Sequence, residues 1–210
     1  MKQNSENPFF GTYRTPFETP PFDQIETEHY EPAFDEGIRQ LDEEVRAIAD
    51  NAELPTFENT IVALERSGKL LDKVSSAFFN VLNAEADDEM MDISQRVSPK
   101  LSESSNNIYL NEKLFARVKS VYDQKEELHL PTEDARLLEE TFEAFSVRGA
   151  ALGPENKEKY RRLSSELSLL SLTFDQNALK DKNRYELLLT KEDELEGLPG
   201  KHTRSRRTQG

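Results

Sequence analysis

The stretch TFENTIVALERSGKLLDKVSSAFFNVLNA, residues 56–84, decides the fold of this chain. Thr56 follows a proline and is one of the residue types that cap a helix N-terminus. Apolar and small side chains then recur at alternating steps of four and three, the spacing of one helix face: Phe57, Ile61, Leu64, Gly68, Leu71, Ser75, Phe78 and Leu82. A second, mainly apolar row lies beside the first. The pattern predicts one long central helix over residues 56–84 that other helices cover, with no chemistry in its own side chains.

The same periodicity predicts further helices on both sides of this stretch. We expect them at residues 32–50, 87–107, 111–124, from 132 to the Gly153-Pro154 pair, and 155–179. Pro99 should kink or break the helix over 87–107. In the last helix five side chains share a face that should turn inward: Tyr160, Leu163, Leu167, Leu170 and Phe174. We expect helices 32–50 and 155–179 to pack against the central helix.

The two ends of the chain differ from its helical part. Residues 7–22 hold four prolines, which exclude a regular helix, and five aromatic side chains, which are too apolar for a free linker. We predict an extended, proline-rich arm over residues 1–26 and a helical domain over 27–199. Residues 184–190, RYELLLT, are strand-like, and a lone strand needs a partner, so two copies could pair there as a homodimer. The predicted fold class is all-α, a multi-helix bundle with at most one short strand near 184–190.

The composition limits the classes of protein that this chain can represent. Its 210 residues suffice for one domain with a sizeable core, and 32% of them are charged. It has no cysteine, which excludes a disulfide framework and a thiolate metal site. No apolar run reaches the ~18 residues of a membrane span, and the first residues do not resemble a secretory signal. The formal net charge of −14 should repel nucleic acid and anionic membranes, and we expect a cytoplasmic protein.

Few residues qualify as candidates for a metal site. The three histidines, His29, His129 and His202, do not have a spacing that lets one helix present two of them to a metal, and the HExxH motif is absent. His29 precedes a helix, which favours a hydrogen-bonded structural role over a ligand role. The acidic residues Asp87, Asp88, Glu89 and Asp92 could suggest calcium. They lack the glycine and the spacing of an EF-hand and are more typical of a helix start.

Two pairs of aromatic residues are candidates for a ligand pocket. Phe78 with Phe79 and Phe142 with Phe145 could line one, but their helical spacing is more typical of a core. The nucleophile-elbow, dinucleotide-binding and P-loop patterns are missing. From the residues alone we therefore assign no catalytic, cofactor-binding or metal residue.

Long strings of the sequence resemble one family of enzymes. NPFF near the start, PPFDQIETEHYEPAFDEG, PTFENTIVALERSGKLLDKVSSAFF and IYLNEKLFARV are similar to the amino-terminal region of bacterial peptidyl-dipeptidases (Dcp-like). These belong to the thimet oligopeptidase and oligopeptidase A family of zinc metallopeptidases. The similarity extends over residues 7–199 and leaves the oligopeptidase A branch less well separated from the peptidyl-dipeptidase branch.

The resemblance implies a larger parent enzyme with two helical lobes around a deep channel for short peptides. In the family one zinc is held by the two histidines of HExxH and a downstream glutamate, and the glutamate of the motif activates the zinc-bound water. A peptidyl-dipeptidase cuts dipeptides from peptide C-termini. None of these residues carries over to this chain, so we expect it to form one channel wall, to bind no catalytic zinc, and to be inactive without a carboxy-terminal catalytic half.

Residues 200–210, GKHTRSRRTQG, depart from the family, whose members continue with a serine and a pair of alanines. A shifted frame at Gly200 can read ASIREAAGHK, so we interpret the tail as a frame slip and expect it to be disordered. Without its four basic residues the chain has 23 basic and 41 acidic residues, a net charge of −18. A nucleic-acid-binding or localisation signal and an adaptation to an acidic partner are the other interpretations. The alternative for the whole chain is a stand-alone helical binding or regulatory module.

Overall fold

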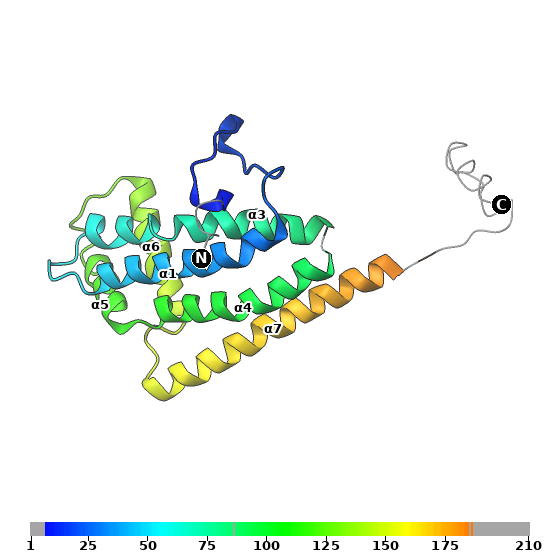
Figure 1. The fold of residues 1–210 in the computed structure, drawn as a ribbon. Helices are drawn as coiled ribbons and strands as arrows, with labels where there is room; N and C mark the ends of the chain where they lie inside the picture. The colour runs from blue at the N-terminus through cyan, green and yellow to red at the C-terminus, as the bar shows by residue number, and fades with distance from the viewer. Residues whose placement is uncertain (1–6, 86, 185, 187–210) are drawn as a thin grey trace, which may run out of the picture. The chain divides into compact units, whose positions relative to one another are not determined.

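The computed structural model describes residues 7–85, 87–184 and 186. It divides into two compact units, Met1–Thr173 and Phe174–Gly210. The described part is helical and contains no strand, which confirms the predicted all-α class (Figure 1). Of the strand-like run 184–190, Arg184 ends a helix, Glu186 is in neither helix nor strand, and the other residues lie outside the described part, as does the tail 200–210. The division at residues 26 and 199 stays a prediction.

The predicted helix over 56–84 is interrupted. A π-helical turn, η4 (Phe57–Val62), continues as the short α2 (Ala63–Glu65), and a separate helix, α3, runs over Lys69–Glu85. Gly68 separates them with φ +76°, a conformation that is cheap for glycine and commonly ends a helix. Its backbone N–H donates to Glu44 Oε2 at 2.7 Å. The prediction of one helix was wrong because Gly68 was read as a small packing residue and not as a helix end.

The helix α1 (Tyr30–Ala49) packs against both α3 and α4 (Asp88–Tyr109) and lies between them in the view of Figure 1. Its apolar side chains at helical spacing are buried or half-buried, with Phe34 and Val45 in the core: Phe34, Ile38, Leu41, Val45 and Ile48. The close approach of α1 to α3 depends on Gly37, since a Cβ there would lie 3.0 Å from Leu71 Cα. Two apolar clusters result, one between α1, α3 and α4, the other under α5 (Glu112–Tyr122) and α6 (Thr132–Val147).

The proline within α4 does not break it. Pro99 lies inside a helix that runs without interruption from Asp88 to Tyr109. A proline removes one intrahelical hydrogen bond, and the buried residues Met90, Ile93 and Val97, packed in the first cluster, hold the turns before it. The sequence predicted a kink or a break at Pro99: the break does not occur, and the kink stays a prediction.

The first part of the amino-terminal arm packs on α3, whereas Phe17 and Phe22 farther along it are 99 and 52% exposed. It contains the 3₁₀ turns η1 (Pro8–Phe10), η2 (Pro16–Glu18) and η3 (Thr27–His29). Phe9 is buried in the first cluster, 5.4 Å from the Tyr30 ring. Lys73 of α3 fixes the arm by donating to the carbonyls of Phe9 and Gly11 at 3.0 and 2.6 Å.

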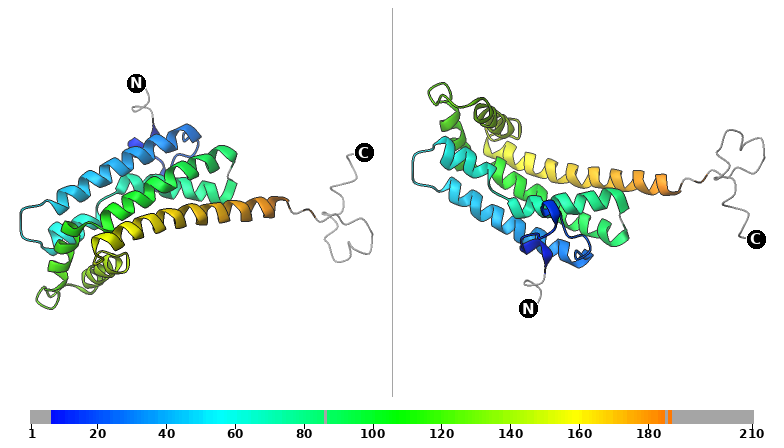
Figure 2. Two further views of the ribbon diagram at one scale, coloured as in Figure 1. Left: turned by 90° about the horizontal axis from the view of Figure 1, so that it is seen from below. Right: turned by 90° about the horizontal axis from the view of Figure 1, so that it is seen from above.

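The last helix, α7 (Pro154–Arg184), starts near its predicted position and extends past Leu179. Residues 154–173 belong to the first unit and run beside α4 (Figures 1 and 2). The predicted inward face is wrong for four of its five residues, because Leu163, Leu167, Leu170 and Phe174 are 49, 64, 60 and 71% exposed. Tyr160 alone is half-buried and lies toward α4. α7 instead meets α4 through polar groups, because the Asn106 amide donates to Ser164 Oγ at 2.8 Å. No described helix is long and apolar enough to cross a membrane.

Candidate functional site

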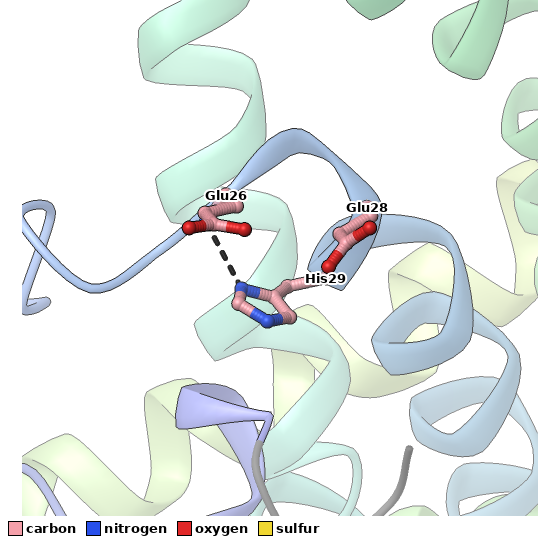
Figure 3. Close-up of side chains that lie close together, drawn as sticks. All are labelled: Glu26, Glu28 and His29. Carbon is pink, nitrogen blue, oxygen red and sulfur yellow. Dashed lines mark hydrogen bonds between the residues drawn. The ribbon is translucent and has the colours of Figure 1, made fainter. Parts of the chain in front are cut away.

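His29 lies at the entry to α1, next to two carboxylates (Figure 3). The possible ligand atoms of Glu26, Glu28 and His29 lie within 4.8 Å of one another, the one such group among the described residues. His29 Nδ1, however, accepts a hydrogen bond from the backbone N–H of Glu26 at 3.0 Å. A neutral imidazole that accepts at Nδ1 carries its proton on Nε2, so neither nitrogen has a free lone pair. The geometry confirms the predicted structural role and does not fit a zinc ligand.

The other histidines do not join this group. His129 lies in the turn before α6 with φ +49°, and its Nδ1 is 2.7 Å from the Glu127 carbonyl oxygen. His202 lies outside the described residues. The structure therefore brings no two described histidines together.

The acidic run at the start of α4 forms a helix cap. Asp87 Oδ1 accepts from the Met90 N–H at 2.8 Å, and Asp88 and Glu89 occupy the first turn. Carboxylates there interact favourably with the positive end of the helix dipole. This is the predicted helix-start role, and Asp92 continues the helix without joining a cluster of possible metal ligands among the described residues.

The aromatic pairs contribute mostly to the core. Phe78 is fully buried and meets Phe34 edge to face, with ring centroids 5.3 Å apart. Phe145 is also fully buried, and half-buried Phe142 stacks on Tyr122 at 3.9 Å. Edge-to-face and offset contacts of this kind stabilise a core beyond the area that they bury. The predicted core role is confirmed for Phe78 and Phe145.

A groove of about 390 Å³ lies between α4 and the first part of α7. Half-buried Phe79 lines it together with hydroxyl, amide and guanidinium groups, among them Ser102, Asn106, Arg148 and Ser164. Asn106 and Ser164 already bond each other, and the guanidinium of Arg148 lies 4.2 Å from the Tyr109 ring centroid. Because these polar groups already interact with neighbours within the protein, we interpret the groove as a polar contact between two helices, which we call the seam.

Two buried cations were not found from the sequence. Arg117 of α5 donates through Nη1 to the carbonyls of Asn51 and Glu53 at 2.8 and 2.9 Å, and through Nη2 to the Asn59 side chain at 3.0 Å. It thereby closes the loop between α1 and η4. Its position between Leu114 and Val118, on the inward face of α5, was the available signal.

Lys157 is the second buried cation. Its Nζ donates to the Leu110 carbonyl at 3.3 Å and to Glu112 Oε1 at 3.0 Å, which holds the start of α7 against the junction of α4 and α5. No periodic signal in the sequence pointed to it. Both cations have structural partners, so neither is available for catalysis.

A cation–π contact joins the arm to α3. Lys73 Nζ lies 3.6 Å from the Tyr13 ring centroid, and burial lowers the pKa of Lys73. Burial, with a smaller contribution from the charge of Tyr30, raises the pKa of Tyr13 to about 12. Both shifts follow from removing these groups from water, and the contact fixes the arm on α3.

Comparison with curated proteins finds relatives that are much longer than this chain. A dipeptidyl carboxypeptidase of Escherichia coli is 43% identical over 173 residues, which are 82% of this chain and 25% of the relative. A dipeptidyl carboxypeptidase of Salmonella typhimurium is 41% identical over 83% of the chain, and an oligopeptidase A of Escherichia coli is 26% identical over 88%. The chain spans about a quarter of these relatives' length. No family model matches it.

Proposed function

Because this chain belongs to the family of the bacterial dipeptidyl carboxypeptidases and oligopeptidases A, we propose that it is the helical amino-terminal lobe of a peptidase. The parent enzyme would be a cytoplasmic zinc metallopeptidase that releases dipeptides from the C-termini of short peptides. The single observation that carries the proposal is 43% identity over 82% of the chain with a dipeptidyl carboxypeptidase. In this proposal the lobe forms one wall of the peptide channel.

The described residues do not fit a catalytic zinc. Such a site needs three protein ligands around an open position and a base near the bound water. The one candidate group, Glu26, Glu28 and His29, has its imidazole hydrogen-bonded at Nδ1. We propose that the zinc ligands and the base belong to the part of the enzyme that this chain does not span, and that this chain alone is inactive.

The test compares this chain with a chimera. In the chimera, the matched quarter of the Escherichia coli dipeptidyl carboxypeptidase is replaced by the aligned residues of this chain. Both proteins are incubated with a short peptide that has a free C-terminus, with and without a chelator. We expect chelator-sensitive dipeptide release by the chimera and none by the chain alone.

Two outcomes would count against the proposal. Dipeptide release by the chain alone would place the chemistry in these 210 residues. A folded but inactive chimera, together with a chain that binds peptides by itself, would support the alternative of a stand-alone binding module.

A further inference from the structure

The two sides of α7 have the reverse of the usual polarity. The side next to α4 carries small hydroxyl residues, including Ser164 and Ser168, which line the seam between the helices. Another face of the helix carries Leu163, Leu167 and Leu170, which are 49, 64 and 60% exposed. A helix on the surface of a finished domain buries its apolar stripe and exposes its polar one. In the first part of α7, Leu163, Leu167 and Leu170 therefore face solvent, while Ser164 and Ser168 face α4.

The spacing of these leucines indicates what kind of surface would cover them. They follow one another at steps of four and three, and Phe174 continues the same spacing in the sequence. Steps of four and three form a straight seam along a helix, and a seam of this kind pairs with another helix. Single exposed leucines are ordinary, whereas a contiguous row at helical spacing marks an interaction surface. We call Leu163, Leu167 and Leu170 the α7 stripe.

We propose that the α7 stripe docks an apolar helix from the part of the peptidase that this chain does not span, an inference that rests on the proposed function. The relatives supply such a partner, because about three quarters of their length lies outside the matched residues. Hydrogen bonds at Asn106, Asn107 and Lys157 join the first part of α7 to α4 and α5. An amphipathic helix is normally held in place by burial of its apolar side chains, and in α7 the docked helix would supply that burial.

Two other occupants fit the observations less well. A second copy of this chain would bring together two molecules of net charge −14, and that charge opposes association. A peptide substrate would require a concave site with polar groups that orient it, whereas the stripe is a row of exposed leucines on a single helix. Both occupants are outcomes that the experiment below distinguishes.

The test introduces a charge into the stripe and measures two proteins. Leu167→Glu is made in the 210-residue chain and in the chimera described above. The matched control is Leu54→Glu, in the loop between α1 and η4, where the side chain is 85% exposed. We expect Leu167→Glu to leave the melting temperature of the 210-residue chain unchanged, to lower that of the chimera, and to reduce its dipeptide release at least tenfold. Leu54→Glu should change neither protein.

Each other outcome overturns a different statement. A folded but inactive unsubstituted chimera contradicts the proposed function. An active chimera that tolerates Leu167→Glu as well as Leu54→Glu overturns the docking inference alone. If Leu167→Glu lowers the melting temperature of the 210-residue chain as much as that of the chimera, the stripe packs within this chain and the docking inference is overturned. If the chain sediments as a dimer and Leu167→Glu dissociates it, the occupant is a second copy. If the chain binds a short free peptide and Leu167→Glu abolishes that binding, the occupant is a peptide. Either result overturns the inference.

Discussion

The helices α1 and α7 carry similar apolar patterns and have opposite surroundings. In α1 the row that includes Phe34 and Val45 is buried, because α3 and α4 both lie against this helix. In α7 the row that includes Leu163 and Leu167 is exposed, while its serines face α4. The comparison teaches that a three-four repeat identifies the face of a helix that needs a cover. Whether the cover lies in the same chain is a separate question.

The largest expected difference is between core and stripe truncations. Phe34→Ala removes a fully buried ring from its contact with Phe78 and should cost about 3–5 kcal/mol of unfolding free energy. Leu167→Ala removes an exposed side chain and should change it by less than about 0.5 kcal/mol. Urea unfolding of both variants at one pH measures the contrast. Equal losses would show that the two helices have the same surroundings, contrary to the structure.

A smaller effect is expected from the close contact of α1 with α3. Gly37→Ala places a Cβ 3.0 Å from the Cα and N of Leu71, and because backbone cannot move aside cheaply, the change should cost about 1–3 kcal/mol. The control is Gly153→Ala, just before α7, where an added Cβ meets no atom within 4 Å. Thermal unfolding of the two variants gives the comparison. A neutral Gly37→Ala would mean that the two helices can separate without loss.

Much of the fold was predictable because it depends on local patterns. Helix starts near residues 111 and 132 were predicted from residue type and spacing, and the structure shows both, with Asn111 as the cap of α5 and Thr132 as the first residue of α6. The serine-glycine pair after Leu64 is a sequence signal for the helix end at Gly68. A glycine within an apolar row is, however, equally consistent with close packing of two helices. Only its positive φ distinguishes the two readings.

The surroundings of α7 and the buried cations could not be predicted in the same way. Periodicity reports that Leu167 and Phe34 belong to apolar rows, yet burial depends on which helices lie nearby, and that is a property of the tertiary fold. Arg117 and Lys157 are buried because backbone carbonyls from distant segments meet them. Every residue type has a backbone carbonyl, so the sequence does not show which carbonyls will contact a buried cation. For the same reason, the absence of metal-binding motifs in the sequence indicated that no metal site is present, but the hydrogen bond at His29 Nδ1 could be found only from the structure.

The polar attachment of α7 predicts an effect of about 1 kcal/mol. Lys157→Met keeps the apolar stem but removes the donor to the Leu110 carbonyl and to Glu112, and a single net hydrogen bond contributes about 0.5–1.5 kcal/mol. Lys159→Met, two residues along the same helix at an exposed position, is the matched control. Urea unfolding measures both variants. If the exposed control costs as much as Lys157→Met, the buried lysine does not hold α7.

The smallest expected effect is a pH dependence of the contact between α1 and α4. Glu31 Oε2 accepts from Arg96 Nε at 3.1 Å, and this hydrogen bond, with smaller contributions from the charges of Arg96 and Lys100, holds the pKa of Glu31 below its usual range. A carboxyl whose pKa is lower in the folded state contributes stability above its unfolded pKa of about 4.3, and that contribution is lost as the pH falls through the folded pKa. Since the pair is partly exposed, Glu31→Gln should lower the melting temperature by no more than about 4 °C at pH 7.

The same measurement distinguishes this contact from the one that holds α7. The difference between wild type and Glu31→Gln should shrink from pH 6 to pH 3, because protonation removes the contact in the wild type. Asn107→Ala is the control: it removes the amide oxygen that accepts from Arg161 of α7 at 2.9 Å, and an amide does not titrate. Its effect should therefore stay constant over that range. If the difference in melting temperature between wild type and Glu31→Gln is also constant with pH, the charge of Glu31 does not stabilise the contact of α1 with α4. The difference between α1 and α7 would then depend only on the burial of their apolar residues.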